Sequence, residues 1–323
     1  MAELTNPHDL FFKSIFSDYE AAADFLRHYL PADIASSFDY SNLQIVKDSF
    51  VDQELREHFS DILYQVGLLD GENAYVYVLF EHKSYPDPLI SFQLLRYMVR
   101  VWELVQRQGE ELELIFSIVV YHGEAKWNVG RNFHDLLGVP APFKNYVPDF
   151  QYFLCDLSKY DDEEIKGGII LHAALLALKY IFSEELRQRM PDIFKLLHDL
   201  LERDRAIEYL ELFLRYLFNA GNKIEKHDLK NAVTTAFPEG GVAMSTIAQE
   251  LIEEGRKQGI QQGFRQGILD AIETDLEFSF GEEGLKEMSE ISKIEDIDML
   301  HAIHRALKTV KSIDELRQIY RSN

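Results

Sequence analysis

The chain has 323 residues, of which 46% are hydrophobic, and a formal net charge of −22 at pH 7. This length can bury a sizeable core and indicates one large domain with a smaller appendage. The charge argues against a nucleic-acid partner unless basic residues are concentrated on one surface, because phosphate binding needs a basic footprint. The single cysteine, Cys155, excludes an internal disulfide and fits a reducing cytosol.

The sequence contains no segment that predicts a membrane span. The start of the chain lacks a basic region followed by an apolar one. The longest apolar stretch, residues 167–178, is interrupted by His172 and is too short to cross a bilayer. We therefore expect a soluble cytoplasmic protein with no membrane partner.

Two helices and a series of strands are predicted first along the chain. Residues 8–30 predict a helix pair, in which Asp18 caps the second helix and Pro31 ends it. Strands are predicted at about residues 43–50, 60–69, 74–83, 113–121 and 152–156, with a helix at residues 89–108. An N-terminal helix before strand-strand-helix-strand predicts an α/β sandwich with a mixed sheet.

The third predicted strand ends in charged residues where a polar turn would normally begin. Because side chains alternate along a strand, Glu81 and Lys83 share one face, and His82 leaves only its carbonyl near that face. Carboxylates, a carbonyl, waters and phosphate oxygens would complete the octahedron that Mg²⁺ prefers. Lys83 would then neutralise charge on a scissile phosphate or hold the attacking water. Taken alone, the pattern also fits a surface ion pair at a strand terminus.

Asp61, on the preceding predicted strand, is the second candidate metal ligand. In an antiparallel hairpin, directly opposed residues have a constant index sum and point to the same face. A two- or four-residue turn near Gly71 gives a sum of 143, which sets Asp61 opposite His82 and away from the face of Glu81. Joint metal binding needs a sum of 142, from a loop with an odd number of residues or from a bulge, for example at Gly67.

The helix predicted at residues 89–108 has a basic stripe and an apolar stripe, at about 100° per residue. The basic stripe holds Gln93, Arg96, Arg100 and Arg107, and the apolar stripe holds Ile90, Leu94, Met98, Val101 and Val105. The basic stripe predicts a surface that faces DNA. It also fits an ordinary solvated face, because Glu103 lies on it too.

Several motifs occur in order along roughly the first two hundred residues: His8-Asp9-x-Phe11-Phe12-Lys13, Phe25-Leu26, Leu30-Pro31, Phe80-Glu81-His82-Lys83-Ser84, Gln93-Leu94-Leu95-Arg96-Tyr97 and Tyr121-His122-Gly123. With Asp61, this set resembles the recombination-promoting nuclease (Rpn) family, also described as YhgA-like transposases, of the PD-(D/E)XK nuclease superfamily. The resemblance implies a restriction-endonuclease-like core, a mixed central sheet flanked by helices, followed by a C-terminal helical region. It also implies metal-dependent DNA endonuclease activity, with links to recombination, mobile elements and phage defence.

The resemblance also implies a site. The expected catalytic residues are Asp61, Glu81, Lys83, Gln93 and Tyr97, and the expected ligands of Mg²⁺, or of Mn²⁺ or Ca²⁺ in its place, are Asp61, Glu81 and the His82 carbonyl. Gln93 and Tyr97 would position Lys83 or a phosphate, although Tyr97 also fits a tyrosine that packs on the sheet. Glu20 lies where related nucleases often place an extra acid, and it equally fits a solvated acid favoured by the helix dipole.

The histidines outside this set are interpreted as structural. His8, His58 and His122 are isolated in the sequence and lack metal-ligand spacing. His122 and Gly123 predict a turn after a strand. The loop at residues 122–148 is long, which suggests a function or an irregular cover over the site.

The rest of the chain is predicted to be helical. Helices at residues 173–181, 191–201 and 206–218 predict a small bundle on the core, with Leu and Phe stripes that are core rather than cofactor contacts. The expected domains are a nuclease core (1–160), a helical bundle packed on it (161–240), a glycine-repeat helix (241–275) and a small helical C-terminal unit (276–323).

Four glycines recur every four residues: Gly255, Gly259, Gly263 and Gly267. Each costs about 1 kcal/mol relative to alanine in a helix interior, so something must offset roughly 4 kcal/mol. A glycine stripe lets a second helix approach closely with a right-handed crossing. We expect a partner helix here, from a second copy in a homodimer or from the bundle. A flexible segment and a backbone groove against DNA, beside Arg256, Lys257 and Arg265, are the alternatives.

Three functions fit the sequence. The first is a Mg²⁺-dependent DNA endonuclease, which the intact acid-acid-lysine set favours. The second is a catalytically silent, dimeric DNA-handling or interaction module of a mobile element. The third is an RNA nuclease, because the metal chemistry at phosphorus is the same and the choice of DNA depends on groove shape.

Overall fold

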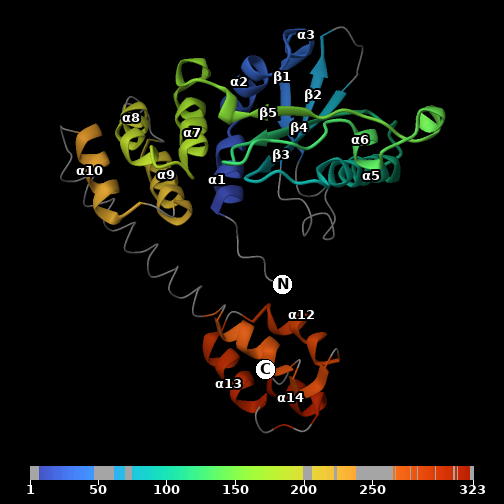
Figure 1. Cartoon of the computed structure of the whole chain (residues 1–323), viewed down its shortest axis with the longest axis vertical. Helices are drawn as coiled ribbons and strands as arrows, with labels where there is room; N and C mark the ends of the chain where they lie inside the picture. The colour runs from blue at the N-terminus through green and yellow to red at the C-terminus, as the bar shows by residue number, and fades with distance from the viewer. Residues whose placement is uncertain are drawn as a thin grey trace. The chain divides into compact units, whose positions relative to one another are not determined.

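The computed structural model describes residues 7–46, 62–69, 75–198, 206–221, 224–237, 265, 267–276, 278–281, 283–294, 296–307, 310 and 312–320. The chain divides into two units, Pro7–Gln249 and a second made of Met1–Asn6 with Glu250–Asn323 (Figure 1). Among the described residues, no helix is long and apolar enough to cross a membrane.

A five-stranded mixed sheet lies at the centre of the larger unit. The strands are β1 (Phe38–Ile45), β2 (Ile62–Leu68), β3 (Tyr75–Lys83), β4 (Leu114–Tyr121) and β5 (Phe153–Asp156). They follow one another across the sheet in chain order, β1 to β3 antiparallel and β3 to β5 parallel. This arrangement confirms the expected α/β fold with a mixed sheet.

The first strand begins earlier than the sequence predicts. β1 starts at Phe38 rather than at about residue 43, and it is described as far as Ile45. Its first half looks like a turn in sequence because the Asp39 carboxylate accepts hydrogen bonds from Ser41 and Asn42. The pairing with β2 also shifts register between Asp39 and Gln44, so no simple alternation marks this strand.

The β2–β3 ladder has the register that joint metal binding requires. Ile62 pairs with Phe80 and Gly67 pairs with Tyr75, an index sum of 142 at both ends of the ladder. The last pair, Gly67 and Tyr75, is separated in sequence by residues 68–74, an odd number, as this register requires. Asp61 and residues 70–74 lie outside the described residues.

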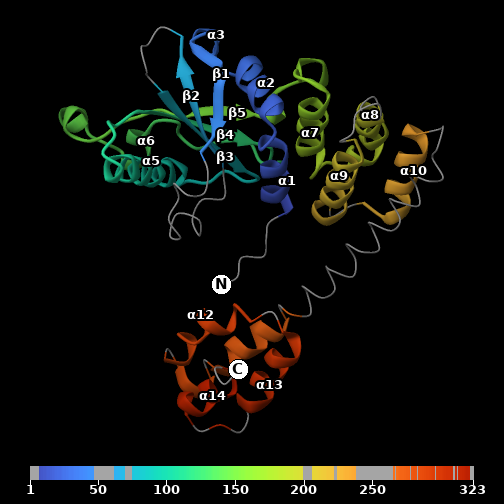
Figure 2. The same cartoon turned by 180° about the vertical axis from the view of Figure 1, so that it is seen from behind.

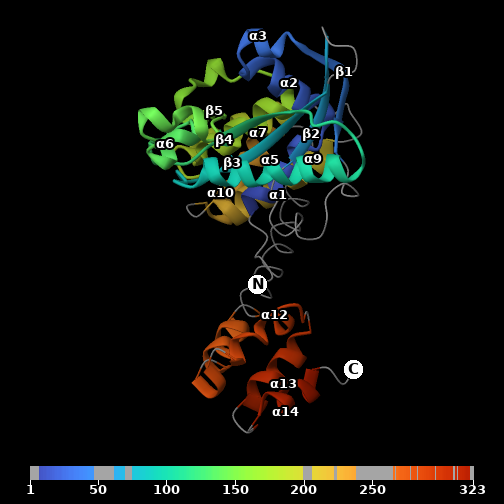
Figure 3. The same cartoon turned by 90° about the vertical axis from the view of Figure 1, so that its right-hand side faces the viewer.

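One face of the sheet is covered by the helix that connects β3 to β4. This helix, α5 (Ile90–Arg107), crosses the face as Figure 3 shows, and it matches the predicted helix. Ile90, Leu94 and Tyr97 of this helix belong to a hydrophobic cluster with Val119 and Tyr121 of β4. The predicted apolar stripe is confirmed, because each of its five members is buried.

The opposite face is covered by α1 (Pro7–Phe16) and α2 (Tyr19–Tyr29), the predicted helix pair. Phe80 of β3 is completely buried there, between the rings of Phe16 and Phe25. Asp18 caps α2 as predicted, since its carboxylate accepts hydrogen bonds from the amides of Glu20 and Ala21. The short α3 (Ala32–Ala35) follows Pro31.

Four helices extend the larger unit beyond α1. They are α7 (Ile169–Tyr180), α8 (Leu186–His198), α9 (Ala206–Ala220) and α10 (Lys226–Ala236), and they lie side by side in Figures 1 and 2. α1 packs against both α7 and α9. The apolar residues predicted as core are buried, for example Phe213 and Leu217. α8 begins at Leu186 and runs through Pro191, where the sequence predicts a helix start.

The long loop after β4 packs against the sheet. It contains α6 (Phe133–Leu137) and a 3₁₀ helix (Ala141–Tyr146), and Trp127 is buried beside Tyr121 and Tyr152. At Gly123 a Cβ atom would lie 2.0 Å from the Ser84 carbonyl oxygen, so only glycine allows this loop to pass the chain that leaves β3.

The C-terminal unit has its own hydrophobic core. It contains α12 (Met288–Ile291), α13 (Ile297–Leu307) and α14 (Ile313–Tyr320), and residues 267–276 are helical. Its buried cluster includes Ile272, Leu276, Ile291, Leu300, Ile303 and Leu316. Buried Glu287 accepts hydrogen bonds from Arg317 and Tyr320. The helices predicted for the tail are therefore present and packed together.

Candidate active site

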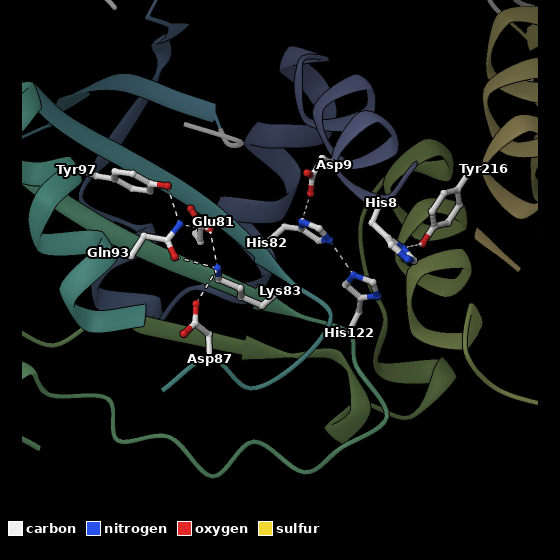
Figure 4. A network of polar contacts seen from close by, with 10 residues as sticks. All are labelled: His8, Asp9, Glu81, His82, Lys83, Asp87, Gln93, Tyr97, His122 and Tyr216. Carbon is white, nitrogen blue, oxygen red and sulfur yellow. Dashed lines mark hydrogen bonds and ion pairs between the residues drawn. The ribbon is translucent and has the colours of Figure 1, made fainter. Parts of the chain in front are cut away.

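The charged residues at the end of β3 lie under α5. Glu81 is 1% exposed and the Lys83 side chain is 11% exposed, so this is a buried pair and not an ion pair on the surface. Strand alternation sends His82 to the opposite face, towards α1, as Figure 4 shows. The Lys83 ammonium lies 3.3 Å from Glu81 Oε1.

Gln93, in the first turns of α5, connects the members of this group. Its side-chain carbonyl accepts a hydrogen bond of 2.9 Å from Lys83 Nζ, and its amide nitrogen donates one of 2.9 Å to Glu81 Oε1. The same nitrogen lies 2.6 Å from the hydroxyl of Tyr97, one turn further along α5. Glu81, Lys83, Gln93 and Tyr97, predicted from separate parts of the sequence, are thus brought together in one cluster (Figure 4).

Asp87 is a member of the cluster that sequence reasoning missed. Its Oδ2 lies 3.2 Å from Lys83 Nζ, and its Oδ1 accepts a hydrogen bond from the amide of Leu89 just before α5. The signal in the sequence is an acid four residues after the lysine and two before Leu89, the residue that precedes α5. Asp87 therefore links the position of Lys83 to the start of α5.

Lys83 is positively charged in this cluster. Burial lowers the pKa of its ammonium, but the carboxylates of Glu81 and Asp87 raise it by more, and the net pKa lies above the ordinary value. A protonated lysine cannot act as a general base. It can stabilise negative charge or orient a water molecule.

One carboxylate oxygen of Glu81 has no partner among the described residues. Its Oε1 contacts Lys83 and Gln93, whereas Oε2 is buried and makes no hydrogen bond in the described part of the chain. Buried carboxylate oxygens normally have a partner, so Oε2 fits a metal ligand. The described residues hold no group of three or more His, Cys, Asp or Glu side chains arranged for a metal ion. Mg²⁺ accepts such a site, because it is usually bound by one or two carboxylates with waters and phosphate oxygens.

The remaining predicted residues are placed as follows. Asp61 lies outside the described residues. Glu20 is exposed in the first turn of α2, on the helices of the opposite face, and it makes no contact with the described members of the cluster. Arg96, Arg100 and Arg107 are exposed along α5, and Arg100 forms an ion pair of 3.1 Å with Glu103.

His8 and His122, interpreted as isolated in sequence, lie beside His82 in the structure. His82 Nε2 and His122 Nε2 are 3.0 Å apart, and the His8 ring centre lies 5.2 Å from that of His122. The signal was available in the strand pairing. Lys83 lies beside Tyr121 in the parallel ladder, which puts His122, one residue later, on the same face as His82.

A double-mutant cycle tests whether Glu81 and Lys83 form a coupled buried pair. Lys83→Met should lower the free energy of unfolding by about 3 kcal/mol, because it leaves a buried carboxylate without its cation. Adding Glu81→Gln should recover at least about 1 kcal/mol of that loss in urea denaturation. Exposed Lys126→Met, the control, should change it by less than about 0.5 kcal/mol. Additive effects of the two site substitutions would contradict the coupling.

Comparisons with known proteins agree on one family. Residues 6–208 match the family model described as "Putative transposase, YhgA-like". The recombination-promoting nucleases RpnA and RpnC of Escherichia coli (strain K12) are each 28% identical to the chain, over 78% and 79% of its length and 86% and 83% of theirs. The inactive recombination-promoting nuclease-like protein RpnE of the same strain is 26% identical over 79% of the chain and 84% of its own length.

No solved structure matches the chain. The family model covers well over half of the sequence, including all five strands and the cluster at the end of β3. The relatives span most of the chain at similar identity. The chain therefore belongs to the YhgA-like family that contains the recombination-promoting nucleases.

Proposed function

We propose that this protein is a metal-dependent DNA endonuclease of the PD-(D/E)XK type. The observation that carries the proposal is the buried cluster under α5, in which a Glu81 oxygen without a partner among the described residues lies beside a protonated Lys83. A protein gains little stability from such a group, since burying a charge is costly unless all of its atoms are paired. The names of the relatives support nuclease activity for a site of this kind.

The proposed reaction is hydrolysis of a phosphodiester bond by a water molecule. Lys83 stabilises the negative charge that develops on the phosphate and helps to orient the water. Gln93 and Asp87 hold Lys83 Nζ from two sides, at 2.9 and 3.2 Å, so the ammonium is fixed before substrate arrives. Tyr97 holds the amide of Gln93.

Mg²⁺ is the proposed cofactor, held by Glu81 together with Asp61 and the His82 carbonyl. The β2–β3 register of 142 supports a shared face for the two acids. When bound, the ion supplies a Lewis acid that polarises the phosphate and lowers the pKa of a bound water. Mn²⁺ or Ca²⁺ is expected to replace it in binding. We do not assign Glu20 to this site, because it is exposed on the opposite side of the sheet.

Cleavage of plasmid DNA tests the function. Purified protein should nick or linearise supercoiled plasmid with Mg²⁺ and leave it intact with EDTA. Glu81→Gln and Lys83→Met should each lower the rate by at least about 100-fold, measured at equal folded fraction because the pair is buried. Lys126→Met should cleave like the unmodified protein.

The same assay separates the proposal from its two alternatives. One relative is named as inactive. A catalytically silent DNA-handling module would bind plasmid without cleaving it. An RNA nuclease would cleave RNA and leave the plasmid supercoiled. Cleavage that survives EDTA or the Glu81→Gln substitution would contradict the proposed site.

The exposed arginines of α5 are proposed to bind the phosphate backbone, because they follow Gln93 along the helix. Replacing Arg96 and Arg100 together by glutamine should weaken DNA binding and reduce the slope of log K against log salt by about 2. Arg305→Gln, an exposed arginine of α13, is the matched control. An unchanged slope in the α5 variant would place the DNA elsewhere.

We also propose a homodimer through the glycine-repeat helix. Of the four glycines, only Gly267 is among the described residues, and a Cβ there would meet no described atom within 4 Å. The mass of the protein in solution distinguishes packing between chains from packing within the chain. Arg265 does not support the alternative of a backbone groove against DNA, because its guanidinium donates hydrogen bonds to the carbonyls of Ser292 and Ile294.

A further inference from the structure

A polar network of Asp9, His82 and His122 lies on the face of β3 opposite the candidate active site. His82 Nδ1 is 3.0 Å from Asp9 Oδ1 of α1, and His82 Nε2 is 3.0 Å from His122 Nε2, just after β4 (Figure 4). The His82 side chain is 3% exposed and His122 is 2% exposed. Three segments far apart in sequence therefore meet at the one residue between Glu81 and Lys83.

The two imidazole rings face each other through their Nε2 atoms, and His82 Nδ1 faces the Asp9 carboxylate, which can only accept. The two Nε2 atoms at 3.0 Å have room for one shared proton. Burial, followed by the neighbouring His82 and His8, lowers the pKa of His122 well below its ordinary value, which agrees with a single N–H on that ring.

Ring contacts connect this polar network to the helices beyond α1. His8 Nδ1 is 3.0 Å from the hydroxyl of Tyr216 on α9. The His122 ring stacks on Phe182, two residues after α7, at 5.6 Å between ring centres and 10° between planes. Around His82, α1 therefore contacts α9 through His8, and His122 contacts the segment after α7 through Phe182, on the side that faces away from Glu81 and Lys83.

We propose that Asp9 and His122 are positioning residues that hold His82, and through it Glu81 and Lys83, in the geometry needed for cleavage. The inference rests on the proposed nuclease function. Neither residue faces the cluster under α5, so they act through the backbone of β3. The polar network is not a metal site, because no group of described side chains here is arranged to hold a metal ion. His82 and His122 are buried and Asp9 is partly exposed; polar contacts of buried groups favour one arrangement, and small displacements of catalytic groups are costly.

Paired substitutions separate positioning from general destabilisation. Asp9→Ala should lower kcat for plasmid cleavage by about 10- to 100-fold, with KM changed less than about threefold. Asp9→Asn keeps an oxygen acceptor and should recover kcat to within about threefold of the unmodified protein. Ser14→Ala, an exposed position on the same helix, is the matched control.

His122 provides a second, independent variant in case Asp9→Ala does not fold. His122→Phe keeps a ring against Phe182 and removes the contact with His82 Nε2, so it should lower kcat like Asp9→Ala. His122→Gln restores a polar side chain and should recover part of the loss. The inference is wrong if both Asp9→Ala and His122→Phe keep kcat within about twofold of the unmodified protein. It is also wrong if neither polar variant recovers activity.

Hydrogen–deuterium exchange gives a readout that needs no activity. In Asp9→Ala, the amides of Glu81 to Lys83 should exchange at least about tenfold faster, while those of α5 change less than about twofold. Equal acceleration throughout the sheet, or none, would overturn positioning. An unmodified protein that cleaves neither DNA nor RNA would refute the proposed function, and the exchange result would then decide the inference alone.

Discussion

The alternation of side chains at the end of β3 is the constraint on which the site depends. Glu81 and Lys83 turn towards α5, and His82 between them turns towards α1. Three successive residues therefore place a carboxylate and an ammonium on one face of the sheet and an imidazole on the other. Both sets are buried, so the backbone between them is held from two sides at once.

The topology explains why this position can carry a reactive group. The chain leaves β3, enters α5 after a short loop and returns in parallel as β4, so the start of α5 lies over the end of the strand. Gln93 and Asp87 come from this connection and both contact Lys83. The helices α1 and α9 meet at His8 and Tyr216 on the other face, which joins the helical layer to the same strand end.

Much of this arrangement could be predicted from sequence, and the exceptions have physical causes. The strand ending at Lys83, the two-faced α5 and the cap at Asp18 follow from local periodicity and turn chemistry. β1 was misplaced because a register shift and a local Asp39 network hide its alternation. The meeting of His82 with His122 depends on parallel pairing between strands that are forty residues apart, which no local pattern encodes.

Binding of Mn²⁺, followed by electron paramagnetic resonance, tests most directly the claim that the β3 cluster is a metal-dependent site. The account predicts that the unmodified protein binds Mn²⁺, that Glu81→Gln loses this binding, and that Lys83→Met keeps it, because the lysine holds water and phosphate and not the ion. Equal Mn²⁺ affinity in the unmodified protein and in Glu81→Gln would contradict the account, whatever activity accompanies it.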